Sequence, residues 1–193
     1  PFDWRTTYFT GTTRGFIGTP GKKTSSHFIK DNFGFILKRS RLIGTTSFQH
    51  AIVCNSFIDI NFLADQSYLF PLYIYPDNSE QKTIEANSER KPNLNHKIVN
   101  EIAKILGLEF VSDHEILKQV KHDKNFTPLD ILDYIYAILY SPSYRKKYNE
   151  FLKIDFPKVP YPKDRETFWK LVELGGEIRQ IHLLESSKVE DYI

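Results

Sequence analysis

One apolar helix near the middle of the second half constrains the fold most strongly. In the stretch "TPLDILDYIYAILYSP", Thr127 is a favourable N-cap residue and Pro128 suits the first helical position. Asp130 and Asp133 favour the positive end of the helix dipole. Because "DILDYIYAILY" is apolar on nearly every face, other elements must surround it. We therefore predict that this helix is the centre of the second half.

Three more helices are predicted around it. Residues 93–107 end at a glycine, a common helix terminator, and their apolar face consists of Ile98, Ile102, Ile105 and Leu106. Ser141 and Pro142 repeat the start signal for "SPSYRKKYNEFLK", and the three prolines of "DFPKVPYP" require an extended segment after it.

The last helix begins at Asp164, which is predicted to cap it. Its apolar stripe is predicted to be Phe168, Leu171, Leu174, Ile178, Ile181 and Leu184. Gly175 and Gly176 fall inside this helix and cost about 1–2 kcal/mol of helix propensity. We therefore expect a kink or a close backbone contact at the glycine pair.

The first 76 residues are β-rich instead. Short runs of aromatic and β-branched residues, separated by Gly, Thr, Ser, Pro and Asn, predict strands at Trp4–Phe9, Gly34–Arg39, His50–Ile60 and Tyr68–Tyr75. Residues 77–92 are polar and aperiodic, which indicates an exposed linker. The predicted fold is α+β: a β-rich part at 1–76 with a mixed or antiparallel sheet, the linker, and a helical part at 93–193.

Cys54 is the single cysteine, so the chain has no internal disulfide, which fits a reducing cytoplasm. Its position within an apolar strand predicts a core residue. No apolar run approaches the ~18 residues of a membrane span, and no membrane partner is expected. The chain has no methionine at its start or elsewhere, and we interpret it as a fragment of a larger enzyme.

Catalytic and ligand-binding motifs are sparse. There is no Gly-x-Ser-x-Gly motif, and the six histidines have no metal-ligand spacing. The loop "GFIGTPGKKTSS" lacks the spacing of a P-loop, and no Gly-x-Gly-x-x-Gly follows a strand. Asp130 and Asp133 are interpreted as helix-start residues. We predict no catalytic residue, no metal site and no cofactor in this chain.

Charge is unevenly distributed along the chain. Residues 1–50 carry eight Lys or Arg against two Asp, a net +6, so the remainder carries −4 given the total of +2. Basic and polar side chains of this kind contact phosphates and base edges in DNA. On residue type and location alone, the candidate DNA contacts are Arg5, Arg14, Lys22, Lys23, Lys38, Arg39, Arg41, Thr45, Thr46, Gln49 and His50, where Arg5 has the alternative of an internal partner in Asp3.

Several stretches resemble one family. "PFDWRTTYF" is similar to the Pro-Phe-Asp-x-Arg-x-x-Tyr-aromatic motif that follows the methyltransferase domain of type ISP restriction–modification enzymes and related adenine-N6 DNA methyltransferases. "YLFPLYIYP" with "RKPNLN" resembles the boundary segment of those proteins. "ILDYIYAILYSPSYRKKYNEFLKIDFPKVPYPKD" with "FWKLVELGGEIRQIHLLE" resembles their C-terminal end, so the resemblance covers nearly the whole chain in order.

The resemblance implies that this chain is the target recognition (specificity) domain of such an enzyme. It would read double-stranded DNA for an upstream methyltransferase domain of the same polypeptide, which uses S-adenosylmethionine. The Asn-Pro-Pro-Tyr type motif of that domain is absent here, so no catalytic residue carries over. A protein–protein docking module, which contacts the methyltransferase or a helicase without reading bases, is the alternative.

Overall fold

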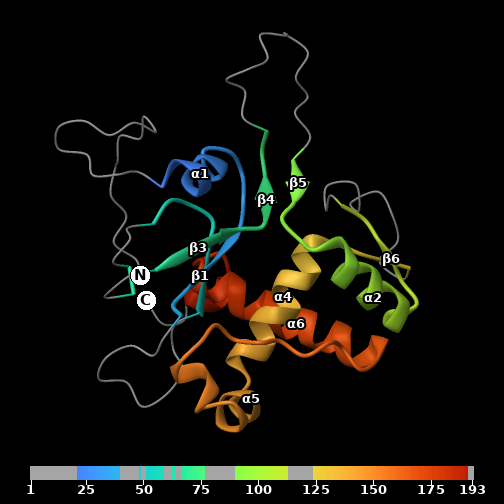
Figure 1. Ribbon diagram of the computed structural model, residues 1–193. Helices are drawn as coiled ribbons and strands as arrows, with labels where there is room; N and C mark the ends of the chain where they lie inside the picture. Colours follow the sequence, from blue (N-terminus) through green and yellow to red (C-terminus); the bar gives the residue numbers. More distant parts are fainter. Residues whose placement is uncertain are drawn as a thin grey trace, which may run out of the picture.

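The computed structural model describes residues 21–39, 48, 51–58, 62–63, 67–76, 90–112 and 124–190. Within these residues the chain has an α+β fold, in which a small sheet lies beside a cluster of helices (Figure 1). This confirms the predicted fold class. The predicted strand at Trp4–Phe9 lies outside the described residues.

Three strands form the main sheet of the described chain. Strand β1 (Gly34–Leu37) lies in the middle, and β2 (Ala51–Cys54) and β3 (Tyr68–Pro71) each pair with it antiparallel. The register places Phe35 opposite Val53 on one side. Each strand falls inside a run that the sequence predicts as β, although the observed strands are shorter than those runs.

A short helical segment precedes the sheet and is anchored in it. It consists of α1 (Lys22–Ser25) and the 3-10 turn η1 (Ser26–Phe28). The Phe28 ring is buried in the core beneath this segment. A Cβ atom on Gly34 would come within 2.7 Å of both the Phe28 ring and the Phe70 carbonyl oxygen. Glycine at the start of β1 therefore leaves the space that the anchoring ring occupies.

A two-stranded ribbon carries the chain from the sheet toward the helices. Strand β4 (Tyr73–Ile74) pairs antiparallel with β5 (Lys91–Pro92). Asn93 then fixes the exit of the ribbon, because its side-chain amide donates to the Pro71 carbonyl at 3.0 Å and its backbone N–H donates to the Leu72 carbonyl at 2.8 Å. The last two residues of the predicted linker therefore belong to a strand.

In the helical part, helices begin at the predicted N-caps Thr127, Ser141 and Asp164, and one helix ends at the predicted Gly107. Its elements are α2 (His96–Leu106), β6 (Glu109–Phe110), β7 (Asn125–Phe126), α4 (Pro128–Tyr140), α5 (Pro142–Lys147), η2 (Phe151–Lys153), α6 (Arg165–His182) and η3 (Ser187–Val189). The Thr127 and Asp164 side chains accept hydrogen bonds from first-turn N–H groups, and Gly107 ends α2 at a φ of 62°. In the described part of the chain, no helix is both long and apolar enough to cross a bilayer.

Helix α4 lies at the centre, as predicted from its all-round apolar character. Figure 1 shows it crossing α6. Leu132 and Tyr136 are buried against the sheet residue Val53, whereas Tyr134 packs on the opposite side against Phe168 of α6. The sheet and the helices therefore share α4 as a common core element.

The buried face of α2 differs from the predicted one. Val99, Ile102 and Leu106 are buried, but Ile98 and Ile105 are each almost half exposed. The observed face keeps Ile102 and Leu106 but has Val99 in place of the two isoleucines, so its centre is displaced by about 50°, half the turn of one residue. Two apolar side chains of α2 are consequently left on the surface.

The predicted stripe of α6 is also partly wrong. Phe168 is buried, but Leu174, Ile181 and Leu184 are exposed. The cause is the glycine pair: a Cβ atom on Gly175 would lie only 1.8 Å from the backbone oxygen of Asp133. Helix α6 therefore approaches α4 backbone to backbone, which confirms the predicted close contact and turns the larger side chains away from it.

Candidate functional site

Helix α1 presents two of the predicted DNA contacts. Lys22 and Lys23 are exposed on it. The turn behind them is held firmly, because the His27 carbonyl accepts a hydrogen bond from the Asn32 amide at 3.0 Å and His27 Nδ1 accepts one from the Tyr75 N–H at 3.2 Å. The arrangement places two cations on a fixed support, where they can meet a phosphate backbone.

Arg39 is a third predicted contact that the structure places on the surface. Its Nε lies 3.3 Å from Oδ1 of Asp155, and the two side chains are 66% and 43% exposed. Exposed ion pairs of this kind contribute only ~0–1 kcal/mol. Arg39 can therefore exchange Asp155 for a phosphate at small cost.

Lys38 is placed differently from its neighbour. The residue is only 5% exposed, so its ammonium group cannot reach a DNA duplex from this position. Lys38 and Arg39 follow directly after β1, and the alternation of more and less buried residues along that strand continues through them. We therefore do not retain Lys38 among the candidate phosphate contacts.

The other candidates lie outside the described residues and stay predictions. They are Arg5, Arg14, Arg41, Thr45, Thr46, Gln49 and His50. Five of them, from Arg41 to His50, fall in the sequence between Arg39 and Ala51, the first residue of β2.

Two tyrosines of α4 bind the edge of β2 that is not paired with β1 in the described sheet. The Val53 N–H donates to the Tyr136 hydroxyl at 3.4 Å, and the Tyr140 hydroxyl donates to the Ala51 carbonyl at 3.1 Å. Two residues of a strand span ~6.7 Å and one helical turn rises ~5.4 Å, so tyrosines four residues apart match alternate strand residues. The helix thus replaces a neighbouring strand along this edge.

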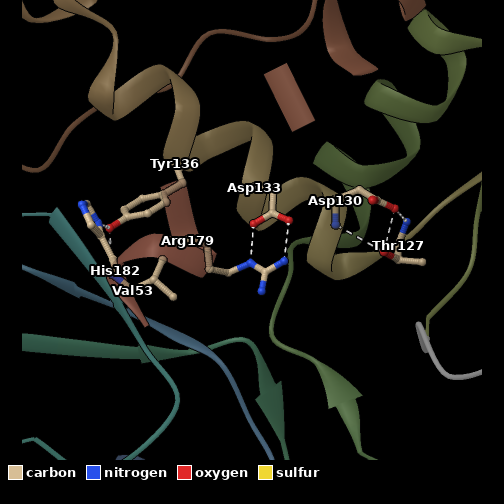
Figure 2. Close-up of polar contacts among 7 residues, drawn as sticks. All are labelled: Val53, Thr127, Asp130, Asp133, Tyr136, Arg179 and His182. Atoms are coloured by element: carbon tan, nitrogen blue, oxygen red, sulfur yellow. Dashed lines mark hydrogen bonds and ion pairs between the residues drawn. The ribbon is translucent and has the colours of Figure 1, made fainter. Parts of the chain in front are cut away.

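The Tyr136 hydroxyl also contacts His182 on α6. Because this hydroxyl accepts from Val53, its own proton is available for Nδ1 of His182, which then accepts as a neutral imidazole (Figure 2). Burial lowers the pKa of His182, and the positive charge of Arg145 lowers it further. Hydrogen bonding and charge both favour the neutral histidine, which links α6 through α4 to β2.

A buried ion pair locks α4 to α6. Arg179 donates through Nε to Oδ1 of Asp133 at 2.7 Å and through Nη2 to Oδ2 at 3.1 Å, and both side chains are below 10% exposure (Figure 2). Burial raises the pKa of Asp133, and the hydrogen bonds from Arg179 oppose that rise. The interpretation of Asp133 as a helix-start residue is therefore incomplete, since its main partner lies on α6.

The sequence contains a signal for the Asp133–Arg179 ion pair that the predictions above do not include. Asp133 interrupts an otherwise apolar helix, and a buried carboxylate needs a partner. Gly175 and Gly176 mark the place where a second backbone approaches, and Arg179 follows within one turn. An acid in the apolar middle of one helix, together with a glycine pair one turn before an arginine in another, could have predicted the contact.

The described residues offer little for catalysis. Cys54 is buried as predicted, and burial raises the pKa of its thiol to about 12, so it stays protonated near neutral pH. Among the residues that the structure describes, no three His, Cys, Asp or Glu side chains are grouped to hold a metal ion. The surface instead presents the exposed cations Lys22, Lys23 and Arg39.

Two solved structures share this fold. One is the "ATP-dependent Type ISP restriction-modification enzyme LlaBIII bound to DNA", with a TM-score of 0.56 and 23% identity over 80% of this chain and 8% of that one. The other is DrdV in a "cryoEM structure DrdV-DNA complex", with a TM-score of 0.57 and 20% identity over 83% of this chain and 13% of that one. This chain thus spans a small part of either protein.

The comparison with family models is more specific than the likeness of fold. No curated protein matches the chain significantly. The model of the Type ISP C-terminal specificity domain, in contrast, matches residues 1–193. The chain therefore belongs to the family of Type ISP C-terminal specificity domains, as the resemblance of its motifs predicts.

Proposed function

We propose that this chain recognises a specific DNA sequence for an adenine-N6 methyltransferase of a restriction–modification system. The observation that carries the proposal is the match to the specificity-domain family along the whole chain. The two proteins of similar fold are described as bound to DNA, which supports it. Because the chain spans only 8% and 13% of them, the remaining activities would reside in other parts of its own polypeptide.

In this proposal the chain holds the duplex and an upstream domain performs the chemistry. The methyltransferase domain would bind S-adenosylmethionine and take the target adenine out of the base stack, since a base inside a duplex is not accessible to such an enzyme. The chain itself contributes no catalytic group. Its task is to keep the DNA in register relative to the methyltransferase domain.

The described cations fit the positioning part of this task. Phosphate contacts set the register of a protein on DNA, whereas contacts to base edges give sequence specificity. Lys22 and Lys23 on α1 and Arg39 after β1 are exposed, so we assign them phosphate contacts. We assign base reading to the predicted contacts Arg41, Thr45, Thr46, Gln49 and His50.

Salt dependence of binding tests this assignment in the intact parent protein. Replacing Lys22 and Lys23 by alanine should weaken binding equally for all DNA sequences and lower the slope of log K against log salt by about 0.9 for each lost contact. Alanine at Lys146 and Lys147, two exposed lysines of α5, is the matched control and should leave the slope unchanged. An unchanged slope in the α1 variant would remove Lys22 and Lys23 from the interface.

The docking alternative rests on an exposed aromatic cluster. Tyr68 and Phe70 of β3 are each about 40% exposed, and both rings meet Phe156 edge-on, at centroid distances of 5.2 and 5.7 Å. Aromatic side chains of this kind are enriched at protein interfaces. Footprinting of the parent protein with and without this chain separates the two functions, because a docking module would leave the footprint on DNA unchanged.

A further inference from the structure

The β4–β5 ribbon gathers basic residues from separate parts of the chain. Lys30 follows η1, whereas Arg90 and Lys91 lie at the start of β5. Lys30 Nζ is 5.1 Å from the centre of the Tyr75 ring, and the Arg90 guanidinium is 4.2 Å from the centre of the Tyr73 ring. The fold thus brings three cations together around one short strand.

This ribbon is rigidly connected to helix α1. Ile74 is paired with Lys91 across the ribbon, and the Asn32 side chain forms two hydrogen bonds with the Tyr73 backbone, at 2.8 and 3.1 Å. The Tyr75 N–H bonds to His27 of η1, and Figure 1 shows α1 and the ribbon at the same end of the molecule. The cations of the ribbon and those of α1 are therefore carried by one connected part of the structure.

Basic side chains are in strong excess in this part of the structure. Over residues 21–33, 73–76 and 90–95, the chain has five basic side chains, namely Lys22, Lys23, Lys30, Arg90 and Lys91, and one acidic side chain, Asp31. Four of the five basic residues are exposed, and Arg90 is half-buried. A polyanion is the ligand that such a surface attracts.

The aromatic rings of the ribbon indicate which part of a nucleic acid is contacted. Tyr73 is 1% exposed, and the Arg90 guanidinium lies over its ring, so it cannot stack on a base. Lys30 lies over the Tyr75 ring in the same way. A cation held against a ring loses little conformational freedom on binding, which favours contact with a phosphate.

We propose that Lys30, Arg90 and Lys91 on the β4–β5 ribbon bind the phosphate backbone of duplex DNA, beside the contacts made by helix α1. The inference rests on the proposed function and deepens it, because it adds a surface from the second half of the chain. The ribbon would strengthen binding to every DNA sequence and would leave the choice of target sequence unchanged.

The test measures binding of the intact parent protein to DNA over a range of salt concentrations. Lys30→Gln with Lys91→Gln removes two charges and is expected to reduce the slope of log K against log salt by about 1.8, equally on target and non-target DNA. Adding Arg90→Gln should reduce it by about 0.9 more. The methylated sequence should stay the same.

The matched control is Lys146→Gln with Lys147→Gln, which removes two charges from α5 at the other end of the molecule (Figure 1). A slope that is unchanged in the ribbon variant, or that falls as much in the control, overturns the inference. If the double variant fails to fold, Lys91→Gln alone tests it, because Lys91 is exposed, and the slope should fall by about 0.9.

The outcomes also separate this inference from the proposed function. If the Lys22 and Lys23 variant lowers the slope and the ribbon variant does not, the ribbon inference is wrong and the proposed function stands. If the ribbon variant binds DNA normally but loses a protein partner, the surface is a docking site for an acidic protein and the inference is again overturned. Sequence-selective binding that persists after removal of residues 1–193 contradicts the proposed function itself.

Discussion

A methyl group on Gly175 would lie 1.8 Å from the carbonyl oxygen of Asp133, far inside van der Waals contact. Gly175→Ala should therefore force α4 and α6 apart and lower the free energy of unfolding by about 3 kcal/mol, at the upper end of overpacking effects. Urea denaturation measures the loss.

The neighbouring glycine provides the control for this substitution. A Cβ on Gly176 meets the tip of the Asp133 side chain at 3.2 Å rather than backbone, and alanine gains about 1 kcal/mol of helix propensity. Gly176→Ala should thus be close to neutral. Equal destabilisation by both substitutions would show that the backbone contact at Gly175 is not what limits the helix spacing.

His182 makes the free energy of unfolding depend on pH. Burial holds its folded-state pKa below the ordinary value of 6.5, so the unfolded chain binds the proton more readily. The stabilising contribution of neutral His182 is complete above pH 6.5 and is lost as the pH falls from there toward the folded-state pKa. His182→Gln removes this titration.

The measurement is the free energy of unfolding of both proteins between pH 8 and pH 5. As the pH falls below about 6.5, the wild type should lose stability relative to the His182→Gln variant. Parallel curves over this range would contradict a histidine that is held neutral by the Tyr136 hydroxyl and by burial.

At the scale of elements, the support of β2 by α4 predicts a local effect on the sheet. Tyr136→Phe removes the acceptor of the Val53 N–H and leaves that group unpaired, at a cost of about 1–3 kcal/mol. Amide hydrogen exchange at Val53 should accelerate in the variant. Tyr144→Phe is the control, because its hydroxyl donates to the Lys158 carbonyl away from the sheet, and Val53 should then keep its protection.

The caps of the helices could be predicted from sequence, whereas the orientation of the helices could not. Thr127 and Asp164 cap their helices as expected, because capping depends on residues within one turn. The exposed positions of Ile98 and Leu174 were not predicted, since the buried face depends on the partner that packs there. For α6 that face is set by Gly175, whose lack of a side chain allows the close approach.

At the scale of the whole molecule, the candidate DNA-binding surface also depends partly on sequence composition and partly on tertiary packing. The excess of basic residues in the first 50 positions selected Lys22, Lys23 and Arg39 as candidate DNA contacts, and the structure places all three on the surface. It also selected Lys38, which the fold buries. The charge composition could not select Lys91, because only the pairing of β4 with β5 connects this residue to the first part of the chain.

The central claim concerns the whole chain, and an exchange of domains tests it most directly. In the intact parent protein, residues 1–193 would be replaced by the corresponding domain of a family member that has a different target, and the methylated adenines would be mapped along a DNA of known sequence. The account predicts that the methylated sequence changes to that of the donor domain. A folded, active hybrid that still methylates the original sequence would contradict it.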